Sequence, residues 1–263
     1  MQFEGQIRKM ITENETPVKY YWDFKHDFIT MNRLLGKKIK VTFDHYECLG
    51  CGEDKEIYQM GYCKNCFFTL PQANPSIISP EKSTAHLGIE QRDLEWEKAF
   101  ELQPHVVYLA NSSGIKVGVT RETQIPTRWI DQGASEAIVI ARTENRYQAG
   151  MIEVALKDFI ADKTNWQRML KNDVPEVNLY EQFEALKNNV REEEQQFLVN
   201  EPEVYKLEYP VLAFPEKVKS VNLKKTPEIE GTLKGIKGQY LIFEDNSVFN
   251  VRGHEGFYVK VEI

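Results

Sequence analysis

The sequence lacks long apolar runs and an excess of positive charge, and it contains only four cysteines. No apolar stretch approaches the roughly 20 residues of a membrane-spanning helix, so no membrane partner is expected. The first residues do not have the shape of a signal peptide, and a cytoplasmic location is therefore expected. The net charge of −7 argues against a protein that binds nucleic acid through many phosphate contacts.

The acidic charge is concentrated in one part of the chain. Residues 176–208 contain nine acidic and three basic residues, so the remainder is close to neutral. Apolar residues recur at helical spacing in this part, which predicts an acidic helical linker over residues 173–208 with one packed face. The apolar residues are Leu179, Phe183, Leu186 and Val190. With 263 residues, the chain is long enough for two or three units with a sizeable core.

The four cysteines form two Cys-x2-Cys pairs separated by eleven residues, Cys48 with Cys51 and Cys63 with Cys66. Two such turns can present four thiolates to one tetrahedral ion, and zinc suits a closed, redox-silent site. Two disulfides or an iron–sulfur cluster are the alternatives, and disulfides are disfavoured without secretion. The pattern predicts a structural zinc-binding unit over residues 44–70. Nearby His45 is either a spare ligand or, more simply, a surface histidine.

Both ends of the chain have the pattern of β-strands. Residues 1–43 form a β-rich region whose aromatics belong to the core of a sheet, the favoured interpretation, or stack on bases. These aromatics are Tyr20, Tyr21, Trp22 and Phe24. Residues 209–263 contain short, evenly spaced strands divided by glycine and asparagine turns, which predicts a small β domain. The two ends are expected to join in a small barrel or curled sheet.

A connector is predicted over residues 71–104, where prolines and turn-forming residues interrupt regular structure. Within it, residues 93–102 have the pattern of a short helix. The side chains expected to face inward on this helix are Leu94, Ala99 and Phe100. His86 and His105 flank the connector. Each histidine either titrates in a cleft or, by the simpler interpretation, lies on the surface.

Residues 105–172 have the most regular pattern. Two β-branched runs, 106–110 and 115–119, are separated by a glycine-bearing tetrapeptide, which predicts a hairpin. A helix is expected from Pro126, a third strand over residues 137–141, and a longer helix opened by Asn145. Its predicted buried stripe is Ile152, Ala155, Leu156, Phe159 and Ile160. A capping box from Thr164 to Gln167 predicts a last helix.

This order of hairpin, helix, strand and helix resembles the GIY-YIG nuclease domain. The signature residues of that family are matched in order by Tyr108 in Val106-Val107-Tyr108, Lys116 in Lys116-Val117-Gly118, Arg128, Glu153 and, more weakly, Asn165. The resemblance covers about a quarter of the chain and implies a central GIY-YIG-like α/β unit. Together with the zinc unit and the β-rich ends, it predicts an α+β fold.

The resemblance implies a metal-dependent endonuclease that hydrolyses phosphodiester bonds of DNA or RNA. In such an enzyme Glu153 would hold Mg²⁺ or Mn²⁺, and Arg128 would stabilise charge on the phosphate. Tyr108 would orient or deprotonate the attacking water. Lys116 stands where the family usually has tyrosine, as in variants with Lys-Ile-Gly. It would act as a base if desolvated, or bind phosphate if exposed.

The segments 116–121, 126–129 and 163–166 are also similar to an uncharacterised bacterial family, domain of unknown function 2797. This similarity extends over most of the chain and implies no activity. Two functions remain, a nuclease and a non-catalytic module that binds nucleic acid or a protein partner. The low positive charge and the missing second tyrosine favour the module. Tyr108, Arg128 and Glu153 together favour the nuclease, which is the interpretation we adopt.

Overall fold

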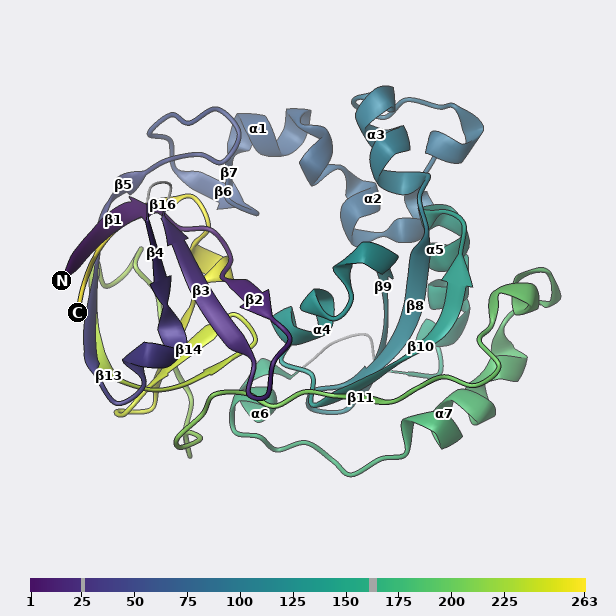
Figure 1. The fold of residues 1–263 in the computed structure, drawn as a ribbon. Helices are drawn as coiled ribbons and strands as arrows, with labels where there is room; N and C mark the ends of the chain where they lie inside the picture. Colours follow the sequence, from purple (N-terminus) through teal and green to yellow (C-terminus); the bar gives the residue numbers. More distant parts are fainter. Residues whose placement is uncertain (25–26, 161–164) are drawn as a thin grey trace. The chain divides into compact units, whose positions relative to one another are not determined.

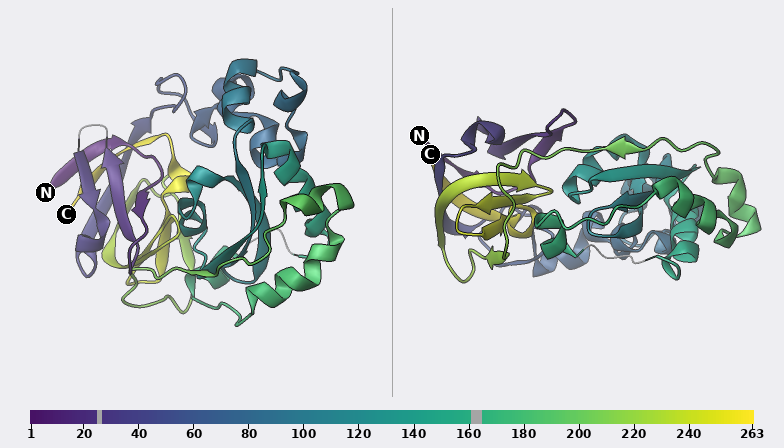
Figure 2. Two further views of the ribbon diagram at one scale, coloured as in Figure 1. Left: turned by 45° about the vertical axis from the view of Figure 1, so that its right-hand side comes forward. Right: turned by 90° about the horizontal axis from the view of Figure 1, so that it is seen from below.

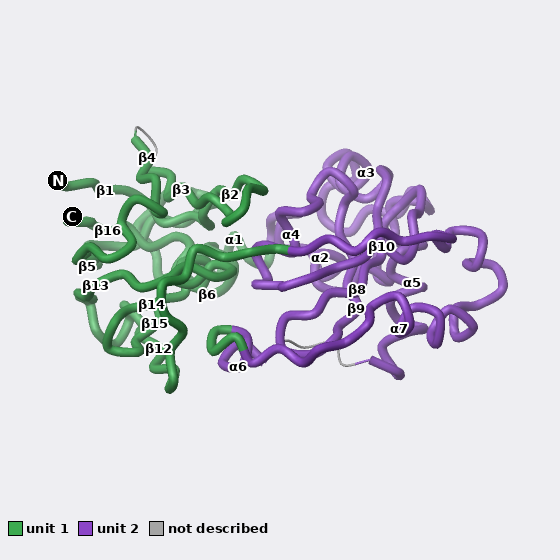
Figure 3. The backbone as a smooth tube through the Cα atoms, turned by 60° about the horizontal axis from the view of Figure 1, so that its bottom comes forward, with its two compact units in different colours: residues 1–68, 170–172, 207–263 green, residues 69–169, 173–206 purple. Residues whose placement is uncertain are grey.

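The chain forms two compact units, each with its own mixture of helices and strands. The computed structural model describes residues 1–24, 27–160 and 165–263 (Figure 1). Unit 1 comprises residues 1–68, 170–172 and 207–263, and unit 2 comprises residues 69–169 and 173–206 (Figure 3). The predicted α+β class is confirmed, because both helices and antiparallel strands are present.

A seven-stranded sheet dominates unit 1, and it combines two strands from residues 2–46 with five strands from residues 219–262. Its order is β1-β16-β5-β13-β14-β15-β12, with only the β12–β15 pair parallel. The strands are β1 (Gln2–Gln6), β5 (Lys38–Tyr46), β12 (Lys219–Val221), β13 (Glu228–Lys237), β14 (Tyr240–Phe243), β15 (Ser247–Asn250) and β16 (Phe257–Glu262). β1 and β16 lie side by side, which brings the two termini together (Figure 2).

The expected small barrel is wrong, although the two ends of the chain do join in one sheet. Among the described residues no hydrogen-bonded pair links the edge strands β1 and β12, so the sheet is open. The physical reason lies in the edges: β12 pairs with β15 over only three residues, and β1 ends at Gln6. Neither edge is therefore extended far enough to pair with the other.

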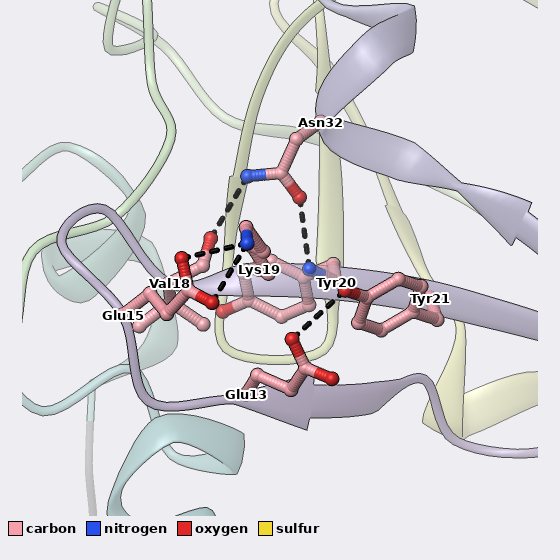
Figure 4. Close-up of polar contacts among 7 residues, drawn as sticks. All are labelled: Glu13, Glu15, Val18, Lys19, Tyr20, Tyr21 and Asn32. Carbon is pink, nitrogen blue, oxygen red and sulfur yellow. Dashed lines mark hydrogen bonds and ion pairs between the residues drawn. The ribbon is translucent and has the colours of Figure 1, made fainter.

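A three-stranded sheet in unit 1 comprises β2 (Ile11–Glu13), β3 (Lys19–Phe24) and β4 (Asp27–Thr30). Burial alternates along β3: Tyr20, Trp22 and Phe24 are buried, as the favoured core interpretation predicted, and Tyr21 is half-buried on the opposite face. The Asn32 amide nitrogen donates to the Val18 carbonyl oxygen at 2.9 Å. Its side-chain oxygen accepts the Tyr20 N–H at 2.8 Å (Figure 4).

Lys237 of β13 is a buried cation inside unit 1. Its Nζ donates to Asn172 Oδ1 at 2.8 Å and lies 5.4 Å and 5.7 Å from the ring centres of Tyr209 and Phe214. Burial lowers the pKa of the Lys237 amine to about 8. One hydrogen bond and two aromatic faces replace the lost water, and they attach residues 170–172 to this unit.

The sheet of unit 2 confirms the predicted hairpin and third strand. β8 (His105–Asn111) and β9 (Ile115–Arg121) form the hairpin, β10 (Glu136–Thr143) pairs with β8, and β11 (Tyr205–Lys206) completes the order β11-β10-β8-β9. Tyr108 faces Gly118 across the hairpin. All neighbouring strands are antiparallel.

Helices α5 (Arg146–Lys157) and α7 (Leu179–Leu186) cover one face of this sheet. Asn145 caps α5 as predicted, accepting the Gln148 N–H at 3.0 Å. Phe159 of the predicted stripe is 57% exposed, because α5 ends before it. The packed face of the 173–208 segment is confirmed. The core comprises Val107, Leu109, Val117, Val119, Ile138, Ile140, Ala149, Ile152, Leu156, Leu179, Phe183, Leu186 and Val190, among others.

The remaining elements are short. They are β6 (Ile57–Gln59), β7 (Tyr62–Cys63), α1 (Lys64–Thr69), α2 (Pro75–Ile78), α3 (Leu94–Glu101), α4 (Thr127–Asp131), α6 (Trp166–Leu170) and, within the described residues, eight short 3-10 helices. Helix α6 contains Trp166 as expected, but Thr164 of the predicted capping box lies outside the described residues.

The predicted connector helix exists as α3, with Asp93 as its N-cap, but its predicted inward face is only partly buried. Leu94 and Phe100 are half-buried and Ala99 is exposed. Glu97 and Glu101, which were not expected inside, are only 1% and 2% exposed. The Glu97 carboxylate accepts the backbone N–H groups of Gln91 and Arg92 at 3.0 and 2.8 Å. It also accepts the Asn74 amide at 2.9 Å. Buried carboxylates thus take the place of an apolar stripe.

Replacing Glu97 by alanine should lower the free energy of unfolding by about 3 kcal/mol or more, because several donors lose their acceptor in the interior. Urea denaturation provides the measurement. Glu95→Ala is the matched control on the same helix, since the Glu95 side chain is 90% exposed and its removal should cost under about 0.5 kcal/mol. Equal effects of the two substitutions would contradict the assigned role of Glu97.

Candidate functional site

The four cysteines form one compact group in unit 1. Their sulfur atoms all lie within 4.8 Å of one another, and Cys51 Sγ lies 4.0 Å from Cys63 Sγ. Cys48 and Cys51 occupy the turn after β5, Cys63 ends β7, and Cys66 lies in α1. All four are free thiols, because a disulfide requires two sulfurs near 2 Å.

Backbone N–H groups point at the first thiol of the group. Gly50 and Cys63 donate to Cys48 Sγ at 3.4 and 3.1 Å. Burial raises the pKa of the Cys48 thiol, but these donors outweigh it and lower the pKa to about 6. Burial, followed by the neighbouring thiols, raises the pKa of Cys66 to about 12. Several thiolates this close together repel one another, and a bound cation would relieve that repulsion. The four sulfurs can hold one metal ion such as zinc.

The hairpin of unit 2 places Tyr108 and Lys116 on the same face of its sheet. Tyr108 lies opposite Gly118 and Lys116 lies opposite Ala110, so both side chains point away from the α5 and α7 core. A Cβ at Gly118 would lie 2.6 Å from the Tyr108 hydroxyl oxygen. This glycine therefore leaves room for the tyrosine ring. The Tyr108 hydroxyl donates to Gln132 Oε1 at 3.1 Å.

Arg128 of α4 joins these two residues. Its side chain is hydrogen-bonded to Tyr108, and its charge acts on Lys116. Burial, together with the nearby Arg128 guanidinium, lowers the pKa of the Lys116 amine to about 7. Burial opposes the charge of Arg128, but Tyr108, Asp131 and Glu153 outweigh it and raise the pKa of the guanidinium. The face thus combines a permanent cation with an amine that titrates near neutrality.

Glu153 lies on α5 and is 8% exposed. Its Oε2 lies 3.4 Å from Lys157 Nζ and, among the described residues, receives no hydrogen bond. Burial raises the pKa of the Glu153 carboxyl, although Lys157 and Arg146 favour the charged form. The carboxylate also acts on Arg128. The simpler interpretation was an exposed helix glutamate paired with Lys157. The ion pair is present, but the glutamate is buried.

Asn165 is exposed and caps α6. Its side-chain oxygen accepts the Arg168 N–H at 3.2 Å, and its own N–H donates to Ser113 Oγ at 2.9 Å. Tyr108, Lys116 and Arg128 are thus brought together, with Glu153 within electrostatic range of Arg128. Asn165 instead forms hydrogen bonds with Arg168 and with Ser113, which lies in the turn between β8 and β9.

Two residues important to this region were missed by sequence reasoning. Arg146 is 5% exposed and donates to the Ser76 and Ile77 carbonyl oxygens at 2.9 and 2.8 Å. At Gly150 a Cβ would lie 2.4 Å from the Glu81 backbone nitrogen, so α5 and the connector touch closely there. The pair of small residues Ala149-Gly150 inside a helix was the available signal for this close packing.

The surface interpretation of His105 is wrong. His105 is fully buried at the start of β8, its Nδ1 donates to the Gln103 carbonyl oxygen at 2.7 Å, and its Nε2 has no hydrogen-bond partner in the described part of the chain. Burial lowers the pKa of His105 to about 4, so it does not titrate near neutrality. His86 is half-buried and stacks on Tyr147 at 4.3 Å. Exposed His45 pairs with Asp44 and lies outside the four-sulfur group.

Comparison with known proteins gives a family. The model of DUF2797, described as a protein of unknown function, matches residues 36–259. The chain belongs to this family. No curated protein and no solved structure matches it. In the part of the chain that the structure describes, no helix of the DUF2797 protein has the length and apolar character needed to cross a membrane.

Acidification should destabilise the protein through His105. Between the folded pKa of about 4 and the unfolded value of 6.5, the unfolded chain binds more protons than the folded one. The contribution of His105 is therefore complete above pH 6.5 and falls by on the order of 3 kcal/mol as the pH drops to 4. Denaturation at a series of pH values should show a shallower slope in His105→Gln. An unchanged slope, or the same change in His45→Gln, would contradict this assignment.

Proposed function

We propose that this protein is a metal-dependent phosphodiesterase that acts on nucleic acid in the manner of a GIY-YIG endonuclease. The observation that carries the proposal is the convergence of Tyr108, Lys116 and Arg128 on one face of the hairpin. These residues match the order of the family signature. Burial of Lys116 beside Arg128 disfavours the charge of the lysine, and a neutral amine is the form that a general base needs.

Each residue has a role that its environment supports. Lys116, with a pKa of about 7, is partly neutral at physiological pH and accepts the proton of the attacking water. Arg128 keeps its charge and stabilises the negative charge that develops on the phosphate. Tyr108, oriented by Gln132 and Arg128, positions the water. A side chain held by two partners needs no rearrangement during the reaction.

Glu153 is the residue that would hold Mg²⁺ or Mn²⁺. Its buried Oε2 receives no hydrogen bond from the described residues but has the Lys157 ammonium 3.4 Å away, and a divalent cation would take the place of that ammonium. A bound divalent ion would polarise the phosphate and stabilise the leaving oxygen. The four-cysteine group fits zinc in a structural role, because four protein ligands leave no open position for substrate.

One observation favours the alternative, a non-catalytic module that binds nucleic acid or a protein. Tyr108 is 1% exposed and Lys116 is 8% exposed, so the signature residues are largely covered. A degenerate nuclease domain would keep them as packing residues. An activity assay separates the two functions.

The purified protein, incubated with Mg²⁺ or Mn²⁺, should cleave DNA or RNA, and Glu153→Gln should reduce the rate below detection because it removes the carboxylate ligand. Glu144→Gln, on an exposed glutamate near the start of α5, should keep full activity. Single-stranded, duplex and branched substrates are compared on denaturing gels. Cleavage that survives Glu153→Gln, or its absence from every substrate, rejects this route to hydrolysis.

The pH profile of cleavage tests Lys116 within the same assay. A neutral amine acting as base predicts a rate that rises to about pH 7 and then stays level. A lysine that only binds phosphate needs its charge, so the rate would instead fall above pH 7. Lys116→Met should reduce the rate by about 10²- to 10⁴-fold and remove the rise.

Metal analysis of the purified protein should find about one zinc ion per chain, because four thiolates complete one tetrahedral site. Cys63→Ser should lose the zinc and lower the melting temperature, since metal binding contributes to folding. His45→Ala, which changes an exposed side chain near the site, should retain the zinc. Cysteines found in disulfides, or a zinc content near zero, would overturn this assignment.

A further inference from the structure

An open groove of about 500 Å³ lies on the exposed face of the β2-β3-β4 sheet in unit 1. Its lining includes Glu15, Lys19, Tyr21, Phe28, Asn32 and Arg33. Figure 4 shows Lys19 and Tyr21 on β3 with Asn32 beside them. The volume is within the range of small-ligand sites, and the groove is independent of the residues proposed for hydrolysis.

Two aromatic rings form the apolar part of the groove. The Tyr21 and Phe28 ring centres are 6.0 Å apart and the rings are inclined by 67°. Phe28 is 59% exposed. Tyr21 lies on the half-buried face of β3, whereas Trp22 and Phe24 are buried on its opposite face. Exposed Ile11 pairs with Tyr21 on the other side. A contiguous exposed aromatic patch of this kind marks a binding surface.

The charged lining residues are two cations, Lys19 and Arg33, and one carboxylate, Glu15. Glu15 pairs with Lys19 at 2.7 Å, and Glu13 accepts the Tyr21 hydroxyl at 2.8 Å (Figure 4). No acidic side chain of the described residues forms an ion pair with exposed Arg33. The charge of Arg33 is therefore not balanced by an ion pair, and it can attract an anion to the groove.

We propose that this groove binds single-stranded nucleic acid, with an unstacked base on Phe28 and Tyr21 and the adjacent phosphate on Arg33. Rings that accept a base face, next to cations that accept phosphate, are the combination that single strands require. A duplex keeps its base faces stacked and cannot use the rings. The inference rests on the proposed function in one respect: single strands would be the substrate class of the proposed nuclease. Binding itself needs neither Glu153 nor a catalytic metal.

Fluorescence anisotropy with a labelled 15-nucleotide oligo(dT), at low salt and without added divalent ions, tests the proposal on the full chain. The wild type should bind, and Phe28→Ala or Tyr21→Ala should each weaken binding by about 5-fold or more. Arg33→Glu should weaken binding and flatten its dependence on salt. The matched controls are Phe159→Ala, with a ring of similar exposure, and Arg252→Glu, and both should bind as the wild type does.

Three outcomes would overturn the proposed binding site. They are no binding of oligo(dT) by the wild type, unchanged binding by the ring variants, or an affinity for duplex or thymidine monophosphate equal to that for oligo(dT). Circular dichroism checks that each variant is folded, which is expected because Phe28 and Arg33 are exposed. Glu153→Gln separates the two proposals. If it binds oligo(dT) normally while no variant cleaves, only hydrolysis fails; if cleavage persists in Phe28→Ala with binding unchanged, only the groove fails.

Discussion

The buried guanidinium of Arg146 is the interaction on which the middle of the chain depends. It lies at the start of α5 and donates to two carbonyl oxygens of the connector, 70 and 69 residues earlier in the chain. A buried cation must have acceptors, and these two carbonyl oxygens of α2 supply them. The connector is thereby attached to the helix that carries Glu153, and Gly150 permits the contact. Burial also lowers the pKa of Arg146 to about 10, so it stays charged at neutral pH.

Much of the site could be predicted from the sequence because its elements follow from short-range patterns. The hairpin, β10 and α5 follow from alternation, helical spacing and an asparagine cap, all of which act over a few residues. The cysteine group follows from spacing alone, because two short turns fix where four sulfurs can point. Matching Tyr108, Lys116 and Arg128 to a known order required only that β8, β9 and α4 form where their patterns indicate.

What could not be predicted was the burial of charge. Residue type indicates that Glu97, Glu101 and His105 belong on the surface, and the structure buries all three. Their partners are backbone groups of loops, which leave no periodic signal in a sequence. The open sheet was missed for a related reason. Whether β1 meets β12 depends on edge strands far apart in the chain, and local pattern does not reveal how long such edges are.

The discontinuity of unit 1 has a consequence for biosynthesis. Its seven-stranded sheet needs strands from residues 219–262, which leave the ribosome after unit 2, while β1 and β5 emerge before it. Unit 2 lies almost wholly between these segments and can fold while the early strands wait without partners. The nascent chain therefore keeps β1 and β5 without these partner strands until the later strands emerge, and unpaired edges of this kind are open to pairing with other chains.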